Sequence, residues 1–407
     1  MTQKMTRHAI LVLVLAAAVM GTSFGIRQTF GLFMGPITND LTISREVFGF
    51  AVALQNLLWG LTQPLAGIVA DKFGSVRVIV LGSICYVAGL VLLTMSSGTT
   101  EIYLSFGLLV GFGLSGTTFA VVLGAVGRAV PAEKRSMALG IASAGGSFGM
   151  FAFVPAGNLL LNELGWVTSF FCFAAMAATM PLLALGLRGR GKPGPDVAED
   201  EQQKLLPVIG QASRHSGYLL LTAGFFVCGF HLAFVVTHLP SYLIDHGIDR
   251  SIGAWTLALV GFSNIVGTYV CGALGGRYRK KHLLSVLYLL RAAIVAVFII
   301  SPPTATSALV FGAVSGLVWL GTVPLTSGLV GQIFGPRYMA TLFGFVFFSH
   351  QVGSFLGAWL GGIVFEQTGS YQPIWIATIV LSVVAALLHM PIADAPLRRP
   401  AEGVASA

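Results

Sequence analysis

The stretch "AILVLVLAAAVMGTSFGIRQTFGLFM", residues 9–34, decides the class of the fold. It exceeds the roughly 20 apolar residues that an α-helix needs to cross the hydrocarbon core of a bilayer. Its only charged residue is Arg27, and no acidic residue accompanies it. The run is also too long for the apolar part of a secretory signal peptide. We therefore predict an uncleaved first transmembrane helix with an arginine inside it.

The rest of the chain has the same character. Of its 407 residues, 55% are hydrophobic and 9% are charged, against about 25% charged in soluble domains. This composition predicts an all-α integral membrane protein that is in contact with the lipid bilayer. Twelve runs are long enough to span, at residues 9–36, 47–70, 77–96, 102–127, 137–161, 166–187, 217–243, 252–275, 282–301, 306–333, 339–365 and 372–392.

A polar interval rich in charge, glycine and proline divides these spans six and six. The predicted parts are an N-terminal six-helix bundle at 1–187, a cytoplasmic linker at 188–216, a C-terminal six-helix bundle at 217–392 and a cytoplasmic tail at 393–407. If the N-terminus is inside, inner segments hold 19 of the 23 lysines and arginines, and outer loops hold only Arg45 and Arg250. The positive-inside rule then places both termini in the cytoplasm. We expect the inner membrane of a bacterium.

The two halves of the chain resemble each other. Three landmarks recur at offsets of 204 to 208 residues: "GIRQTFGLFMGPI" at 25–37 with "GFHLAFVVTHLPSY" at 229–242, "GIVADKFGSVR" at 67–77 with "GALGGRYRKKH" at 272–282, and Gly145-x-x-x-Gly149 with Gly353-x-x-x-Gly357. The first pair aligns Arg27 with His231. Parallel six-helix repeats are typical of secondary transporters. Gly-x-x-x-Gly spacing allows two helices to approach closely.

The loop between spans 2 and 3 resembles the signature of the major facilitator superfamily. Its pattern is Gly67-x-x-x-Asp71-Lys72-x-Gly74-x-x-Arg77. With twelve spans and the repeat, the resemblance covers essentially the whole chain, and it implies two pseudo-symmetric six-helix bundles that rock about a central site. It also implies that Asp71, with Lys72 and Arg77, latches the cytoplasmic side. The alternative is that these are ordinary charges of an inner loop.

A narrower resemblance is to the monocarboxylate-porter-like and oxalate/formate-exchanger-like branches of that superfamily. It is carried by "GIRQTFGLFMGPI" at 25–37 and by "FFSHQVGSFLGAWLGG" in span 11. Those porters usually carry an acidic residue and an arginine in span 8, where this chain offers Ser263, Asn264 and Thr268.

The ionisable residues inside the spans are basic or neutral. All 15 acidic residues fall in loops or at helix ends, which leaves Arg27, Arg291, His231 and His350 within spans. Such a cavity attracts anions. Arg27 is predicted to contact a substrate anion, with a structural role as the alternative, whereas Arg291 is expected to be structural. Histidine titrates near neutral pH, so His350, and less so His231, is a candidate proton carrier or a helix-bridging residue.

Polar and aromatic residues on the predicted cavity helices complete the candidate site. Spans 1, 4, 7 and 10 line the cavity in the family that the sequence resembles. The candidate substrate-binding residues are Arg27, Gln55, Trp59, Ser115, Thr118, His231, Asn264, Trp319 and Thr322. Apart from Arg27 and His231, each of these residues could instead serve only in helix packing.

These features predict a non-enzymatic secondary transporter that moves a small organic anion, a carboxylate, and is coupled to protons. The alternative is a proton-driven exporter of drugs or other amphiphiles, in which aromatic residues bind the substrate. The four cysteines have no metal-ligand spacing. We expect no metal, no cofactor and no nucleic-acid partner, and we expect a monomer.

Overall fold

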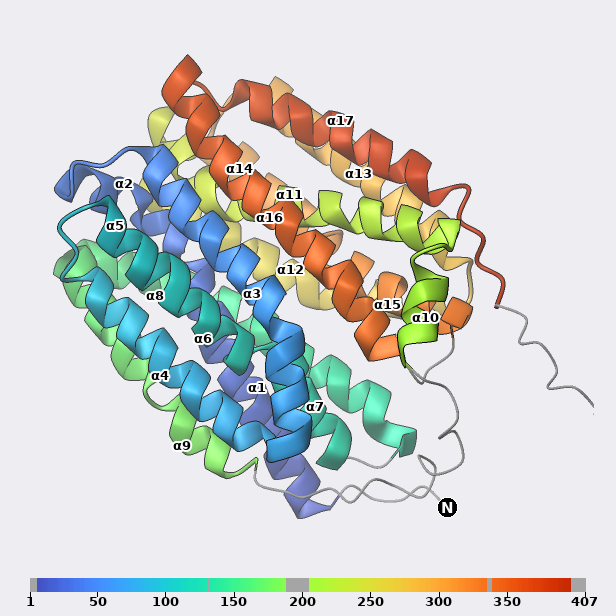
Figure 1. The fold of residues 1–407 in the computed structure, drawn as a ribbon. Coiled ribbons are helices and arrows are strands. Elements are labelled where there is room, and N and C mark those ends of the chain that lie inside the picture. The colour runs from blue at the N-terminus through green and yellow to red at the C-terminus, as the bar shows by residue number, and fades with distance from the viewer. Residues whose placement is uncertain (1–5, 130–131, 188–204, 335–338, 397–407) are drawn as a thin grey trace, which may run out of the picture.

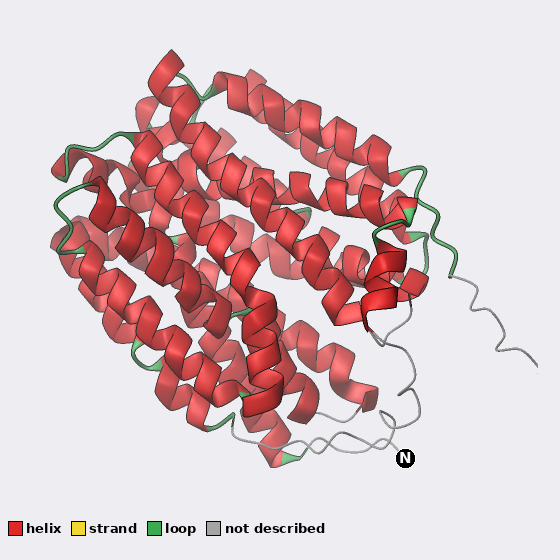
Figure 2. Cartoon of the chain, in the orientation of Figure 1, coloured by secondary structure: helices red, strands yellow, loops and turns green. Residues whose placement is uncertain are grey.

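The computed structural model describes residues 6–129, 132–187, 205–334 and 339–396, and within these ranges all regular secondary structure is helical (Figure 2). The N-terminal half contains α1 (Arg7–Gln28), α2 (Phe30–Asp40), α3 (Arg45–Phe73), α4 (Ser75–Leu93), α5 (Thr99–Ile102), the π-helix η1 (Tyr103–Leu109), α6 (Val110–Thr117), α7 (Phe119–Ala129), α8 (Ala132–Ala177) and α9 (Met180–Leu185). The C-terminal half contains α11 (Ser216–Asp245), α12 (Arg250–Gly275), α13 (Lys280–Ile300), α14 (Ala305–Leu317), α15 (Thr322–Phe334), α16 (Met339–Thr368) and α17 (Gln372–His389).

The helices confirm the predicted membrane-spanning fold. Among the described residues, nine helical stretches are long and apolar enough to cross a membrane, and one of them, Ile141–Leu185, covers two predicted spans. These stretches account for ten of the twelve. The other two spans are α3, whose centre is polar, and the run from α5 to α7, which is divided into short pieces. Most of the predicted linker lies outside the described residues, and its end contains a short helix, α10 (Leu205–Ala212).

Two spans are interrupted near their middle. Span 4 is interrupted at Thr118, whose backbone is extended, and span 10 between Leu317 and Thr322. The boundary between α1 and α2 at Thr29 keeps helical dihedral angles. Irregular backbone at membrane depth is tolerated only where protein or a water-filled cavity surrounds it. The breaks therefore mark the interior of the bundle.

The close helix contacts repeat between the halves. An added Cβ at Gly149 on α8 would lie 2.1 Å from the Gly21 carbonyl oxygen on α1. At Gly353 on α16 it would lie 2.0 Å from the Phe226 carbonyl oxygen on α11. No side chain fits at either position, so the predicted glycine motifs pack span 1 against span 5 and span 7 against span 11.

Hydrogen bonds at equivalent places also repeat. The Tyr86 hydroxyl on α4 donates to the Ser23 carbonyl at 2.9 Å, and the Tyr288 hydroxyl on α13 donates to the Gly224 carbonyl at 2.7 Å. Both tyrosines are fully buried. Each half is thus built around the same internal scaffold, which supports the two-bundle architecture.

The halves join along a few central helices (Figure 1). Helices α3 and α16 run side by side, while α4 and α9 lie at the far edge of one half and α13 and α17 at that of the other. Contacts of α2 with α11 and of α8 with α12 complete the joint. The candidate site lies where these central helices meet.

Candidate functional site

Arg27 is buried between α1 and α3. Only 8% of its surface is exposed. One guanidinium nitrogen donates to the Asn56 side-chain oxygen and the other to Gln28 Oε1 at 3.3 Å, while Nε has no hydrogen-bond partner among the described residues. All of these partners are neutral. The guanidinium charge, which costs about 2.5–3.5 kcal/mol to insert at the centre of a membrane helix, is therefore left without a carboxylate from the protein.

An aromatic cluster lies beside this charge. The Arg27 guanidinium carbon is 5.5 Å from the centre of the Trp59 ring. Trp59 packs against Phe24 and Phe119 of its own half and against Phe347 of α16, with the ring centres 5.7 Å apart in the last pair. Its indole nitrogen donates to Thr118 Oγ1 at 2.9 Å, at the break in span 4. The predicted residues Arg27, Trp59 and Thr118 thus form one group.

His350 approaches this group from the other half. Its ring stacks on Phe347, with centres 5.5 Å apart, and its Nδ1 is 3.0 Å from Gln351 Oε1. Gln351 Nε2 in turn donates to the Asn56 backbone carbonyl at 3.4 Å. A polar chain therefore connects Arg27 through Asn56 and Gln351 to His350 across the joint between the halves.

The sequence reasoning missed the two residues that link this chain. Asn56 was overlooked because its neighbour Gln55 fits the same helical spacing as Trp59. Gln351 was not among the candidate residues, although its neighbour His350 was. A buried amide side chain in a membrane helix is itself a signal, because it must find a hydrogen-bonding partner. That signal would have selected both Asn56 and Gln351.

Arg291 lies elsewhere and has a full set of acceptors. Its Nε and one terminal nitrogen donate to the Val318 carbonyl at 3.0 and 2.8 Å, and the same terminal nitrogen also donates to the Trp319 carbonyl. These carbonyls are exposed by the break in span 10. Beside them, Thr322 Oγ1 is 3.3 Å from the Cys228 sulfur. The geometry of Arg291 is that of a cap on the broken helix, and Trp319 and Thr322 belong to this break.

The remaining candidates lie at helix contacts away from Arg27. Gln55 donates to the Phe106 carbonyl at 2.8 Å, and Ser115 donates to the Phe112 carbonyl of its own helix at 2.7 Å. Asn264 joins Ser147 Oγ to the Leu320 backbone NH, at 3.0 and 2.9 Å. His231 faces α17, where its Nδ1 is 3.5 Å from Ser382 Oγ and where it also contacts the backbone of Thr378. The structure therefore does not bring His231 to its repeat mate Arg27.

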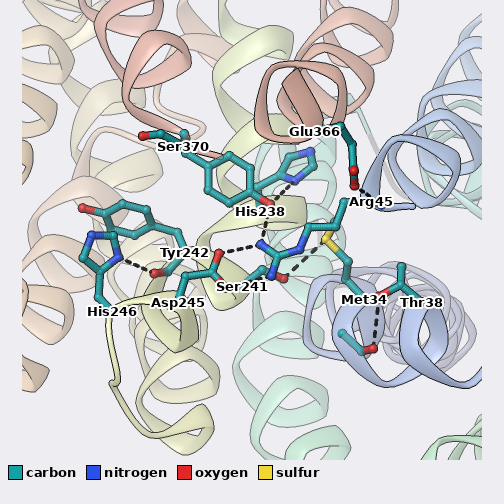
Figure 3. A network of polar contacts seen from close by, with 12 residues as sticks. Met34, Thr38, Arg45, His238, Ser241, Tyr242, Asp245, His246, Glu366 and Ser370 are labelled. Carbon is teal, nitrogen blue, oxygen red and sulfur yellow. Dashed lines mark hydrogen bonds and ion pairs between the residues drawn. The ribbon is translucent and has the colours of Figure 1, made fainter. Parts of the chain in front are cut away.

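A charged network closes one end of the joint, at the loop between α2 and α3 (Figure 3). The loop charges predict that this end faces outside, and it is called the outer end below. Arg45, at the start of α3, makes two hydrogen bonds of 2.5 and 2.7 Å to Asp245, at the end of α11. The Arg45 backbone NH donates to Glu366 Oε1 at 2.8 Å. Between α2 and α11, an added Cβ at Gly31 would lie 2.1 Å from the Val236 carbonyl oxygen. The outer ends of the two halves are thus held in direct contact.

Tyr371 and His238 extend this outer network inward. The Tyr371 hydroxyl accepts from Arg45 at 3.2 Å and is 3.2 Å from His238 Nδ1, and His238 Nε2 is 2.7 Å from the Ala358 carbonyl. Burial opposes the charge of Arg45, but the hydrogen bonds to Asp245 and Tyr371 outweigh it and raise the guanidinium pKa. Burial raises the pKa of Tyr371 to about 12, although Arg45 partly offsets it. Arg45 therefore stays charged and Tyr371 stays protonated.

The predicted latch is only partly described. The side chains of Asp71 and Lys72 lie outside the described residues. Gly74 joins α3 to α4 with φ of 93°, a conformation that favours glycine, and the exposed Arg77 donates to the Phe73 carbonyl at 3.4 Å. Gly67 lies within α3. In the repeat copy of this loop, Arg279 binds Asp394 through hydrogen bonds of 3.1 and 2.5 Å.

The described residues offer no group of three or more His, Cys, Asp or Glu side chains that could hold a metal ion. Around Arg27 the structure brings together a buried arginine, an aromatic cluster and a histidine. Such a group can bind an anion.

Comparisons with known proteins agree with this architecture. The profile of the Major Facilitator Superfamily matches residues 13–358. The monocarboxylate transporter 13 of Bos taurus is 26% identical over 403 residues, which cover 94% of this chain and 90% of the relative. The oxalate:formate antiporter of Oxalobacter formigenes is 24% identical over 385 residues, which cover 92% and 89%.

Solved structures share the fold at lower sequence identity. A bacterial homologue of the lysosomal transporter Spinster, in an inward-facing and unoccupied conformation, aligns with a TM-score of 0.75 at 18% identity, covering 95% of this chain and 97% of the other. The D-xylose–proton symporter aligns with a TM-score of 0.72 at 14% identity, covering 95% and 100%.

Proposed function

The chain belongs to the major facilitator superfamily. On that premise we propose that it is a secondary transporter of a small organic anion, a carboxylate. It alternates between a state open to the outside and a state open to the inside, and its transport is coupled to protons. As a member of this superfamily it is a multi-pass membrane carrier and not an enzyme. The substrate class, the coupling and the alternation of states form the proposal.

The observation that carries the proposal is the environment of Arg27. It is a buried guanidinium whose described partners are all neutral and whose Nε has none. Arginine binds carboxylates in bidentate geometry, so an incoming carboxylate would supply the counter-charge that the protein does not. Relatives named for monocarboxylates and for oxalate and formate support this class of substrate.

His350 is the proposed proton carrier. Gln351 Oε1 can only accept a hydrogen bond, so the contact at 3.0 Å places the hydrogen on His350 Nδ1. The other ring nitrogen is then the atom that can receive a proton. Because Gln351 also bonds to Asn56, whose side chain holds Arg27, a change of charge on His350 would reach the anion site through two residues.

Alternating access would act at the outer network. Arg45 and Asp245 come from different halves, so their ion pair exists only while the outer ends are together. Opening to the outside would separate them, and closing the inner side would use the loop at Asp71, which we propose as a latch. We also propose a bacterial inner membrane, cytoplasmic termini and a monomer, as the charge pattern and the single-chain site suggest.

The test is uptake into proteoliposomes of labelled oxalate, formate and lactate, with and without an imposed pH gradient. We expect at least one anion to accumulate. Arg27→Gln should abolish its uptake, and His350→Ala should remove the effect of the pH gradient while leaving counterflow intact. Arg277→Gln, a matched change at an exposed inner residue, should leave both unchanged. Uphill uptake in His350→Ala would refute the proton-carrier role.

The aromatic cluster supports a second candidate function, the export of amphiphilic compounds. Four aromatic rings follow one another with ring centres 6.1 to 6.3 Å apart, in the order Phe24, Trp59, Phe119 and Phe347. An aromatic surface of this kind binds apolar groups. In that case no small carboxylate would accumulate in the liposomes. Cells without the transporter would instead become sensitive to amphiphilic toxins, and Trp59→Ala would impair resistance more than Arg27→Gln.

A further inference from the structure

A cavity lies on the outer side of the closed joint, away from Arg27. It has a volume of about 430 Å³ and is lined by both halves, with contributions from α2, α8, α11 and the starts of α3 and α12. Arg45 and Arg250 both line it. They are also the two basic residues that the sequence assigns to outer loops.

These two arginines occupy equivalent places in the repeat. Each begins a helix and follows an aspartate by five residues, Asp40 before Arg45 and Asp245 before Arg250. Asp245 has crossed the joint to bind Arg45. Repeat symmetry would have Asp40 bind Arg250 in the same way.

The symmetry is broken at the second pair. Asp40 Oδ2 accepts a hydrogen bond from the Trp166 indole at 2.9 Å. Arg250 Nε is buried and has no hydrogen-bond partner among the described residues. One wall of the cavity therefore holds a guanidinium whose equivalent carboxylate is engaged elsewhere.

The other charged groups nearby are already engaged. Asp245 is neutralised by Arg45. Asp249 accepts from the Ser251 backbone and hydroxyl at 2.8 and 2.5 Å, and its charge also acts on the neighbouring Arg250. Asp40 is exposed, so solvent screens its charge. Among the described residues, Arg250 is influenced by the charge of Asp249 but forms no direct ion pair, and its Nε has no partner. It can therefore still bind a carboxylate.

From this geometry we infer that the outer cavity is a second binding site, in which Arg250 holds a small carboxylate anion before the outer network opens. The inference rests on the proposed function, because it takes the transported class of anion as the occupant. Arg250 captures the anion by a charge-assisted hydrogen bond, and Trp166 forms the facing wall. The deeper site at Arg27 receives the anion after the outer ends separate.

The test is a fluorescence titration of the full-length protein in nanodiscs with sodium oxalate at constant ionic strength. Trp166 lines the cavity, so its emission reports occupancy. We expect a saturable fluorescence change that is lost in Trp166→Phe. The dissociation constant for oxalate obtained from this change should rise at least tenfold in Arg250→Gln. Arg277→Gln should match the wild type, and sodium chloride at the same concentration should give no change.

The two sites are separated by Arg27→Gln. This variant should lose uptake yet keep the Trp166 signal, because it removes only the deeper site. If the signal disappears in Arg27→Gln, or is unchanged in Arg250→Gln, the outer site is refuted. An equal response to chloride would refute its preference for carboxylates. Because the titration needs no transport, a failure of uptake in the wild type overturns the proposed function and leaves this inference to be decided by the fluorescence alone.

Discussion

Asp245→Asn should shift the protein toward states that are open to the outside. The change keeps the shape of the side chain but removes the charge that receives two hydrogen bonds from Arg45, of 2.5 and 2.7 Å. The two side chains are 21% and 28% exposed, so a contribution of about 1–2 kcal/mol is appropriate, between a surface pair and a buried one. At about 1.4 kcal/mol per tenfold change, the open population should rise roughly 5- to 30-fold.

The assay is the labelling of Ser241→Cys by a membrane-impermeant maleimide in right-side-out vesicles. Ser241 is buried in the closed joint, 4% exposed, so its labelling rate reports opening. The parent protein with Ser241 intact corrects for the four native cysteines. Asp249→Asn is the matched control, because Asp249 caps α12 within one half and asparagine caps equally well. If Asp245→Asn labels no faster than Asp249→Asn, the ion pair does not hold the outer side closed.

Three further predictions concern the scaffold. Gly149→Val should lower the free energy of unfolding of the detergent-solubilised protein by about 1–3 kcal/mol, because its Cβ would lie 2.1 Å from a backbone oxygen. Gly344→Val, with nothing within 4 Å of its Cβ, should have almost no effect. Equal melting temperatures of the two variants would contradict the close packing. Arg291→Gln should reduce folded yield and melting temperature for the loss of its carbonyl partners, and a stable variant that lacks only transport would show a substrate role instead. Hydrogen bonds from Arg279 lower the pKa of Asp394. The contact between Arg279 and Asp394 should therefore be complete above the ordinary aspartate pKa and be lost as the pH falls through the lowered pKa. Proteolysis of the C-terminal tail should increase in acid, and Asp394→Asn should remove this pH dependence.

The membrane-spanning helices could be predicted from the sequence because long apolar runs are a direct consequence of the bilayer. The orientation read from the loop charges stays a prediction. The runs at 137–161 and 166–187 were separated correctly, and the turn between them is made by Gly165 with φ of 74°. The breaks at Thr118 and after Leu317 were not predicted. Small and polar residues lie at the first break, while Gly321 lies in the second and Pro324 follows it. Such residues also occur inside continuous helices, for example Pro240 in α11, so they do not locate a break. The tertiary partners Trp59 and Arg291 reveal it.

The direction of a side chain in a span was the harder problem. Helix α11 is buried on most sides, so periodicity could not tell that His231 faces α17 rather than Arg27. The same limit favoured Gln55 over Asn56, although it is Asn56 that holds Arg27. By contrast, the sequence shows directly that no carboxylate lies within the predicted spans. This observation selected Arg27 and His350, which the structure connects through Asn56 and Gln351.

The central claim is that Arg27 receives its counter-charge from a transported carboxylate. The most direct measurement is oxalate counterflow in proteoliposomes, which needs no pH gradient, for the wild type, Arg27→Lys, Arg27→Gln and the control Arg277→Gln. Removing one partner of a buried charge pair costs about 2–5 kcal/mol, so Arg27→Gln should exchange oxalate at least 30-fold less well, with Arg27→Lys between it and the wild type. Wild-type counterflow in a folded Arg27→Gln variant would contradict the claim.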